Sequence, residues 1–236
     1  MRSKLIITAG AALSLLLTAC SPTISNSGSA PVTRGSNYPK MYEETPMTIL
    51  IMPPINNTVD VDAKEYFYTT MAMPLCDKGY YVISPFLAME LMRSESAYDS
   101  ELFLESDLKI FNTVFNADVA LFTVINTWSK SGISGEVSVN IDYIMRSTKT
   151  NEVLFQRNGE VVIDTSVSSG TGGLLGLVVD LAATAINTAM TEKISAAREC
   201  NTFILSDLPE GNYSNNYLKD KEQDAKEINY KGVIKK

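Results

Sequence analysis

The chain has 236 residues, of which 20 are Lys or Arg and 27 are Asp or Glu, so its formal net charge is −7 at pH 7. An acidic chain is a poor match for a nucleic-acid-binding protein, because binding to phosphates relies on clustered Lys and Arg. No histidine occurs anywhere, which excludes Ser-His-Asp and Cys-His catalytic sites and His-containing zinc sites.

The first 20 residues have the parts of a bacterial export signal. Arg2 and Lys4 precede an apolar run over 5–17, which is shorter than the roughly 20 residues of a membrane-spanning helix. The run ends in Leu17-Thr18-Ala19-Cys20, which resembles the lipobox of bacterial lipoproteins, where a cysteine receives a diacylglycerol before the signal is removed. We predict a signal peptide at 1–19 and palmitate and diacylglycerol chains on Cys20. The alternative is an ordinary secretory signal with a cysteine near the cut.

The residues after Cys20 are predicted to hold the domain near the membrane. Ser21 stands where an Asp is typical of inner-membrane retention, so we expect the outer membrane and a domain that faces the periplasm. From 21 to 46 the chain is rich in Ser, Pro, Asn, Thr and Gly and has few large apolar residues. Such a composition buries too little surface to fold, so 20–46 is predicted to be a flexible tether.

An alternation of strands and helices is predicted from residue 47 onward. The continuous apolar run 47–52 predicts a strand covered on both faces. Apolar residues have helical spacing over 61–77, and the second strand is predicted at 80–84. Pro85 then suits the first turn of a short helix over 86–93.

The middle of the chain predicts another helix and an antiparallel meander. After a polar stretch at 94–105, Ser106 is a suitable N-cap for a helix. Over 137–145 apolar and polar residues alternate, which is typical of an antiparallel strand with one covered face. The strands of this region are predicted at 118–128, 137–145, 152–156 and 160–164, with a turn at 147–151.

The last third holds a glycine-rich segment, a long helix and a polar end. Glycines over 168–173 precede a helix predicted at 174–198, and helix N-termini of this kind can bind phosphate. Because no Gly-Lys-Ser/Thr follows, a flexible hinge is the preferred interpretation over a nucleotide site. The helix is expected to pack on the sheet, with a homo-oligomer contact as the alternative. That contact would use Leu174, Leu175, Leu177 and Val178. Residues 213–236 show little periodicity and are predicted to be a solvated tail.

Together these elements predict a single α/β domain over 47–212. It has three layers and a mixed sheet, with a strand-helix-strand-helix start, an antiparallel meander and a long C-terminal helix. A folded part of about 165 residues is large enough for one hydrophobic core.

Two cysteines lie within the predicted domain. Once Cys20 is acylated, Cys76 and Cys200 remain, in a compartment that favours oxidation. We therefore expect a Cys76–Cys200 disulfide. The alternative is two separate buried thiols, because the sequence does not give the distance between their Cα atoms.

Carboxylates remain as candidates for acid–base catalysis, because a glycosidase needs two of them at a suitable separation. The local pairs are Glu43 and Glu44, Asp60 and Asp62, and Glu101 and Glu105. Each pair lies in a polar stretch typical of a solvated surface, so no catalytic residue, cofactor or metal site is predicted. Trp128 is expected to be a core or rim aromatic at a strand end rather than an exposed binding anchor.

Three motifs carry a resemblance to a known family. They are Pro53-Pro54-x-Asn56-x-Thr58, the run from Pro74-Leu75 through Gly79-Tyr80-Tyr81-Val82 to Pro85, and Ala117-Asp118-Val119. With these, and with Gly211-Asn212-Tyr213, residues 45–220 resemble a family of bacterial lipoproteins of unknown function that includes the Neisseria genome-derived antigen lipoprotein. Asn151 stands where relatives tend to have Gly, and Asn212 where Pro is common. Asn accepts a left-handed turn conformation, so the hairpin at 147–151 is still expected.

A wider resemblance is to the curli-secretion lipoprotein and to the lipoprotein activator of penicillin-binding proteins. Both share an α/β domain with a strand-helix-strand start, which implies a periplasmic interaction module and gives no reaction. The leading hypothesis is therefore a non-enzymatic outer-membrane lipoprotein that binds periplasmic or outer-membrane proteins in envelope assembly or transport.

Two alternatives stay open. An oligomeric secretion channel would need added amphipathic strands, and 137–145 with 152–156 give one candidate hairpin. A carboxylate-dependent hydrolase of envelope glycan would depend on a pair such as Asp60 and Asp62.

Overall fold

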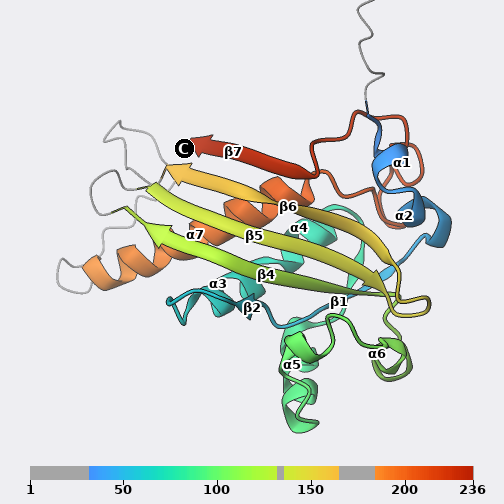
Figure 1. Ribbon diagram of the computed structural model, residues 1–236, viewed down its shortest axis with the longest axis horizontal. Coiled ribbons are helices and arrows are strands. Elements are labelled where there is room, and N and C mark those ends of the chain that lie inside the picture. The colour runs from blue at the N-terminus through green and yellow to red at the C-terminus, as the bar shows by residue number, and fades with distance from the viewer. Residues whose placement is uncertain (1–31, 132–135, 165–183, 236) are drawn as a thin grey trace, which may run out of the picture. The chain divides into compact units, whose positions relative to one another are not determined.

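The computed structural model describes residues 32–131, 136–164 and 184–235, and Figure 1 labels its elements. Among these residues the strands are β1 (Thr48–Ile51), β2 (Ile55–Asn56), β3 (Tyr81–Val82), β4 (Val119–Lys130), β5 (Glu136–Ser147), β6 (Val153–Asp164) and β7 (Asn229–Lys235). The helices are α1 (Arg34–Asn37), α2 (Pro39–Glu44), α3 (Ala63–Thr70), α4 (Ala72–Asp77), α5 (Pro85–Ser94), α6 (Lys109–Phe115) and α7 (Thr184–Leu205), with a short 3-10 helix η1 (Ser100–Leu102).

The strands form one mixed sheet in the order β3-β1-β4-β5-β6-β7, and β2 also pairs with β4. Strand β1 runs parallel to β3 and β4, whereas β4, β5 and β6 form an antiparallel meander. Strand β7 then joins β6 in parallel, after the chain has passed through α7. The α/β class, the mixed sheet and the meander predicted from the sequence are confirmed.

Helices cover both faces of the sheet, and β1 contributes to both cores. Ile49 and Ile51 pack on the face covered by α3, α4 and α7, and α7 runs across the long strands (Figure 1). Leu50 and Met52 pack with α5 and α6 on the other face. All four side chains are at most 1% exposed. The continuous apolar run therefore belongs to a strand covered on both sides, as its pattern predicts.

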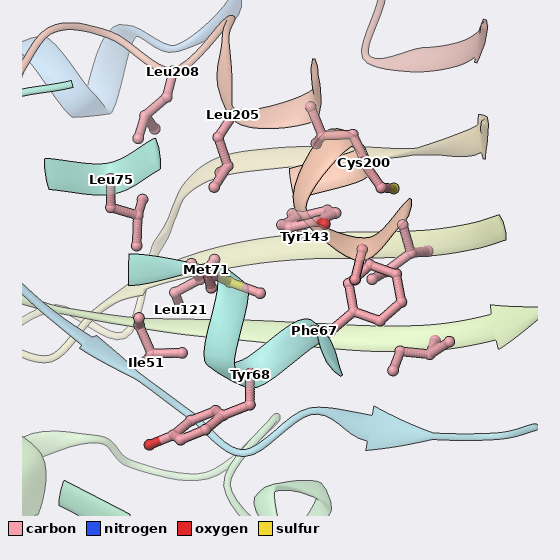
Figure 2. Packing of buried hydrophobic residues seen from close by; sticks show 14 of the residues in the cluster. Ile51, Phe67, Tyr68, Met71, Leu75, Leu121, Tyr143, Cys200, Leu205 and Leu208 are labelled. Carbon is pink, nitrogen blue, oxygen red and sulfur yellow. The ribbon is translucent and has the colours of Figure 1, made fainter. Parts of the chain in front are cut away.

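The larger core lies between the sheet and the helices α3, α4 and α7, and a buried asparagine joins its layers. Asn201 of α7 donates from Nδ2 to Phe67 O at 3.2 Å and to Thr70 Oγ1 at 3.0 Å. Its Oδ1 accepts the Tyr143 hydroxyl of β5. Figure 2 shows Phe67 and Tyr143 in this core. A fully buried amide is tolerated because donor and acceptor both have partners.

The helix predicted over 61–77 is divided into α3 and α4 at Met71. Pro74 lies one turn after the division. Proline has no backbone N–H, and its ring excludes the carbonyl four residues earlier, which here is that of Thr70. The Thr70 hydroxyl donates to Tyr66 O, one turn earlier in α3, at 2.6 Å.

Two further local predictions are corrected. The helix expected to begin at Ser106 begins at Lys109. The Ser106 hydroxyl donates to Leu102 O, and the Leu108 N–H donates to Asn151 Oδ1 of the β5–β6 turn at 2.8 Å. The strands predicted at 152–156 and 160–164 form one strand, β6. Gly159 lies inside this strand and does not end it. The position requires glycine, because a Cβ there would lie 2.0 Å from Tyr230 O of the neighbouring strand β7.

The folded unit extends beyond the predicted limits of 47 and 212 at both ends. Within the predicted tether, α1 and α2 place Tyr38 and Met41 in the larger core, 2% and 3% exposed. Within the predicted solvated tail, β7 places Tyr230 in the same core, 5% exposed. A few large apolar residues are enough to order these segments, because each residue packs against a core that the rest of the domain forms. Residues 20–31 of the predicted tether lie outside the described residues.

Asp118 fixes the start of β1 beside β4. Its Oδ2 accepts the Met47 and Thr48 N–H groups, each at 3.0 Å, and its Oδ1 accepts Lys149 Nζ at 2.6 Å. Burial alone would raise the pKa of the Asp118 carboxyl, but the bonds from Lys149, Met47 and Thr48 outweigh burial and hold the pKa below its usual range.

A pH-dependent effect of Asp118→Asn follows. The folded-state pKa lies below the unfolded value of about 3.9, so the ionised carboxyl stabilises the fold above that pH, and this contribution is lost as the pH falls through the folded-state pKa. We expect Asp118→Asn to lower the free energy of unfolding at pH 7 and the difference from wild type to shrink below about pH 4. Urea unfolding at several pH values measures this. An equal difference at neutral and acidic pH would contradict it.

Candidate functional site

The candidate carboxylates Asp60 and Asp62 have a structural role in the loop between β2 and α3. Asp60 Oδ2 accepts Lys193 Nζ of α7 at 2.7 Å, and its Oδ1 accepts the Asp62 N–H at 3.1 Å. Asn56 Nδ2 donates to Asp60 O at 2.8 Å and closes the same loop. Asp60 therefore ties this loop to the long helix.

The other two carboxylate pairs lie in separate elements. Glu43 and Glu44 end α2, where Glu44 Oε1 accepts the Thr150 hydroxyl at 2.8 Å. Glu101 and Glu105 are exposed on the connection between α5 and α6. Across the described ranges, no three or more His, Cys, Asp or Glu side chains are grouped as metal ligands.

Trp128 is a core aromatic, as expected. It is 6% exposed, and its ring stands edge-on to Phe67 with the centroids 5.3 Å apart. The candidate pore hairpin belongs to the same sheet, since Val139 and Ile141 of β5 are fully buried in the larger core. The glycines at 168–173, the first part of the predicted helix with Leu174, Leu175, Leu177 and Val178, and Cys20 lie outside the described residues.

Cys76 and Cys200 are free thiols in the structure, so the expected disulfide is not formed in it. Cys76 is exposed on α4, whereas Cys200 of α7 is fully buried (Figure 2). Burial raises the pKa of the Cys200 thiol and keeps it protonated. The structure therefore has two separate thiols, as in the alternative interpretation. That interpretation expected both thiols to be buried, whereas Cys76 is exposed.

The two thiols are expected to differ in reactivity. In the folded protein an alkylating reagent should modify Cys76, while Cys200 should react only after unfolding, since the reagent needs an accessible thiolate. Alkylation before and after denaturation with two isotopic forms of iodoacetamide, read by peptide mass spectrometry, distinguishes the two. Protection of both cysteines until a reductant is added would instead indicate the disulfide.

The motif residues that carry the family resemblance make structural contacts. Asn56 Oδ1 accepts the Thr58 N–H at 3.1 Å and so forms the turn after β2. Gly79 has a φ of +82°, a conformation that favours glycine, and its carbonyl accepts the Tyr213 N–H at 2.9 Å. The Tyr80 hydroxyl donates to Pro209 O at 2.8 Å. The Gly79-Tyr80 motif therefore holds the segment that follows α7.

A buried ion cluster joins the N-terminal helices to the same segment. Arg34 Nη1 lies 3.0 Å from Asp220 Oδ2, and Arg34 Nε lies 3.6 Å from Asp207 Oδ1. Both carboxylates are at most 1% exposed, and the arginine side chain is 11% exposed. Tyr38 donates its hydroxyl to Asp207 Oδ2 at 2.7 Å, and burial together with this carboxylate raises the pKa of Tyr38.

Backbone hydrogen bonds surround this cluster. Arg34 N–H donates to Gln223 O at 2.9 Å, and Ala225 N–H donates to Val32 O at 2.7 Å, so 32–35 lie antiparallel to 221–225. We call these paired segments, with Arg34, Asp207 and Asp220, the terminal clasp. The sequence offered no signal for it, because Arg34 lies in a stretch with the composition of a linker.

Polar side chains occupy the far part of the second sheet face, beyond α5 and α6. Asn126, at the bulge of β4, donates from Nδ2 to Asp142 Oδ2 at 2.8 Å and to Asn140 Oδ1 at 3.2 Å. Asn57 Nδ2 donates in turn to Asn126 Oδ1 at 3.3 Å. These groups bond mainly to one another, although Asp142 Oδ1 is buried and has no hydrogen-bond partner within the described residues.

The outside of α5, η1 and α6 has a different character, since large apolar side chains are exposed there. The residues are Phe86, Leu87, Leu91, Leu102, Ile110 and Val114, each between 38% and 72% exposed. We call this set the outer helical surface. The opposite sides of the same helices fill the smaller core through Ala88, Met92, Leu108 and Phe111. Exposed apolar side chains gathered on one layer are typical of an interaction site.

The sequence comparisons agree with each other. The family model of GNA1162-like lipoproteins matches residues 36–212, which is more than half of the chain. A Neisseria meningitidis serogroup B protein described as a lipoprotein, NMB1124/NMB1162, is 24% identical over 163 residues, which cover 66% of this chain and 73% of that protein. None of the helices that the structure describes has the length and apolar character of a membrane span.

Several solved structures are also similar. Lipoprotein GNA1162 from Neisseria meningitidis has 15% identity and a TM-score of 0.46, covering 64% of this chain and 99% of that one. The PelC dodecamer from Paraburkholderia phytofirmans has 19% identity and a TM-score of 0.40, covering 68% of this chain and 87% of that one. The C-terminal domain of LpoB from Escherichia coli has 14% identity and a TM-score of 0.34, covering 54% of this chain and 96% of that one.

Proposed function

The chain belongs to the GNA1162-like lipoprotein family, and from this membership we propose that it is a lipid-anchored, non-enzymatic accessory module that binds partner proteins in cell-envelope assembly or transport. The anchor is Cys20, the membrane is the outer membrane, and the domain faces the periplasm. The export signal at 1–19 and the residues Leu17-Thr18-Ala19-Cys20 support the anchor.

The anchor keeps the domain close to the membrane. The described residues begin at Val32, and a fully extended chain from Cys20 to Val32 would span at most roughly 40 Å. Each buried methylene of an acyl chain contributes about 0.8 kcal/mol, and two or more chains hold a protein stably. The module would therefore bind partners that come within this distance of the membrane.

The observation that carries the proposal is the outer helical surface. Phe86, at 72% exposed, and Leu102, at 65% exposed, are among the side chains that a free-standing domain would bury. The carboxylates Asp60 and Glu44 are instead bonded to residues of the fold. A surface of apolar residues suits binding of another protein better than it suits a reaction.

The test combines fractionation with crosslinking in cells. The wild-type protein should sediment with outer membranes and incorporate labelled palmitate, and Cys20→Ala should do neither. Formaldehyde crosslinking of the anchored protein, followed by mass spectrometry, should recover periplasmic or outer-membrane proteins. Wild-type protein in the soluble fraction, or crosslinks confined to copies of itself in a regular ladder, would count against the proposal.

A further inference from the structure

We propose that the outer helical surface binds a segment of a partner protein that presents apolar side chains flanked by Lys and Arg. This inference rests on the proposed function and specifies the chemistry of the partner. Three features of the surface support it: the alignment of its apolar side chains, the way its backbone is held, and the sign of its charge.

The apolar side chains are aligned along two helices. Leu87 and Leu91 are one turn apart on α5, and Ile110 and Val114 are one turn apart on α6. Residues at this spacing lie on the same side of a helix and form a ridge. Each of the two helices therefore carries one apolar ridge, which can contact the apolar side of another segment.

The backbone between these helices is held by the sheet. Arg146 of β5 donates from Nη1 to the carbonyls of Leu104, at 2.5 Å, and Ser106, at 3.2 Å. The rings of Phe103 and Phe111 meet at a centroid distance of 5.0 Å. Because this connection is already ordered, binding does not carry the free-energy cost of ordering it.

The segment that forms this surface is acidic, and Lys64 of α3 packs on it with Nζ 3.9 Å from the centroid of the Tyr98 ring. Residues 86–114 contain six acidic and two basic residues, a formal charge of −4. Both cations already pair within the segment, Arg93 with Glu90 at 3.4 Å and Lys109 with Asp107 at 4.0 Å. The remaining acidic residues are exposed and form no ion pair within the described part of the chain; they are Glu95, Asp99, Glu101 and Glu105.

This charge selects among possible occupants. An acidic surface repels the anionic headgroups of a membrane leaflet, and it repels its own copy in a two-fold dimer, where like patches face each other. It attracts a segment rich in Lys and Arg and raises the rate of encounter with it. A basic, apolar segment of another protein is therefore the occupant that fits.

Photocrosslinking in cells tests the assignment with the full-length, acylated protein. p-Benzoylphenylalanine is placed at position 91 or 110 in the native host, and at position 59 as a control, since Val59 is 99% exposed in the loop between β2 and α3. Positions 91 and 110 should each give an adduct with the same partner segment, and position 59 should not. Mass spectrometry of the adduct should locate the crosslink among apolar residues flanked by Lys or Arg.

Charge reversal provides the second measurement. Glu101→Lys with Glu105→Lys should lower the adduct yield by roughly tenfold, because both attractions become repulsions. The matched control, Glu43→Lys with Glu222→Lys, reverses two exposed carboxylates elsewhere and should leave the yield unchanged.

Four results would overturn the assignment: no adduct, adducts with lipid, adducts with a second copy of the chain, or a crosslinked segment that is acidic or wholly polar. An unchanged yield after the Glu101 and Glu105 reversals would overturn it as well. If formaldehyde still captures envelope partners in that case, the proposed function stands and only the surface or the partner chemistry is wrong.

Discussion

Arg34→Ala is expected to lower the free energy of unfolding by about 3–5 kcal/mol, because the change leaves two buried carboxylates without their cation. Asp220 and Asp207 are at most 1% exposed, so water cannot replace the guanidinium. The hydrogen bond from Arg34 Nη2 to Ser206 O, at 3.1 Å, is lost in the same change. Urea unfolding followed by the fluorescence of Trp128, the one tryptophan of the chain, measures the effect.

Two variants serve as controls for Arg34→Ala. Lys40→Ala removes another cation of the N-terminal helices, but its pair with Glu152 is 40% and 50% exposed, so the loss should be within about 1 kcal/mol. Arg34→Lys keeps the charge and loses the planar fork, so its stability should lie between those of wild type and Arg34→Ala. If Arg34→Ala costs no more than Lys40→Ala, the clasp does not stabilise the fold.

Gly79→Ala is expected to lower the free energy of unfolding by about 2–4 kcal/mol, from the left-handed backbone and from a steric clash. Its φ is +82°, and a Cβ would lie 2.4 Å from Ser214 N. Since that contact is with backbone, the segment after α7 has to move. The bonds at risk are Gly211 N–H to Lys78 O, at 2.7 Å, and Tyr213 N–H to Gly79 O, at 2.9 Å.

Gly79→Asn separates the two causes. Asn adopts left-handed conformations more readily than Ala, but it brings the same Cβ. Gly79→Asn should therefore be less destabilised than Gly79→Ala and still less stable than wild type. Limited proteolysis should cut 206–228 faster in both variants. Wild-type stability in Gly79→Ala would show that this segment adapts at no cost.

The elements predicted well are those whose pattern is local. The unbroken apolar run of β1 indicated cover on both faces, and the alternation in β5 indicated one buried face. Asn151, with a φ of +63°, forms the expected turn between β5 and β6. The division of a helix at Met71 could also have been predicted, since Pro74 is visible in the sequence.

The segments 32–46 and 213–235 were mispredicted as tether and tail because their order comes from distant contacts. Arg34 lies 186 residues from Asp220, and Gly159 is needed for the approach of Tyr230. Composition reports whether a segment can fold by itself, and these segments fold only against a finished core. The same reason explains why β7 was treated as tail.

The outer helical surface was also missed, although its signal is present in the sequence. In α5 the exposed Phe86, Leu87 and Leu91 and the buried Ala88 and Met92 are all apolar, so the helix is apolar around most of its circumference. A helix of that kind at the surface of a domain buries one side and exposes the other. Which side is exposed depends on the sheet beneath it, and one-dimensional periodicity does not contain that information.

The terminal clasp also determines how the domain bears mechanical load. Tension that enters at Val32 meets Thr33 paired with Asp224, and the chain continues from that pairing into β7 at the edge of the sheet. A pull on the N-terminal end is therefore shared with the C-terminal end, and α1 does not unravel first. The backbone pairing and the Arg34 ion cluster therefore both resist a pull on the N-terminal end.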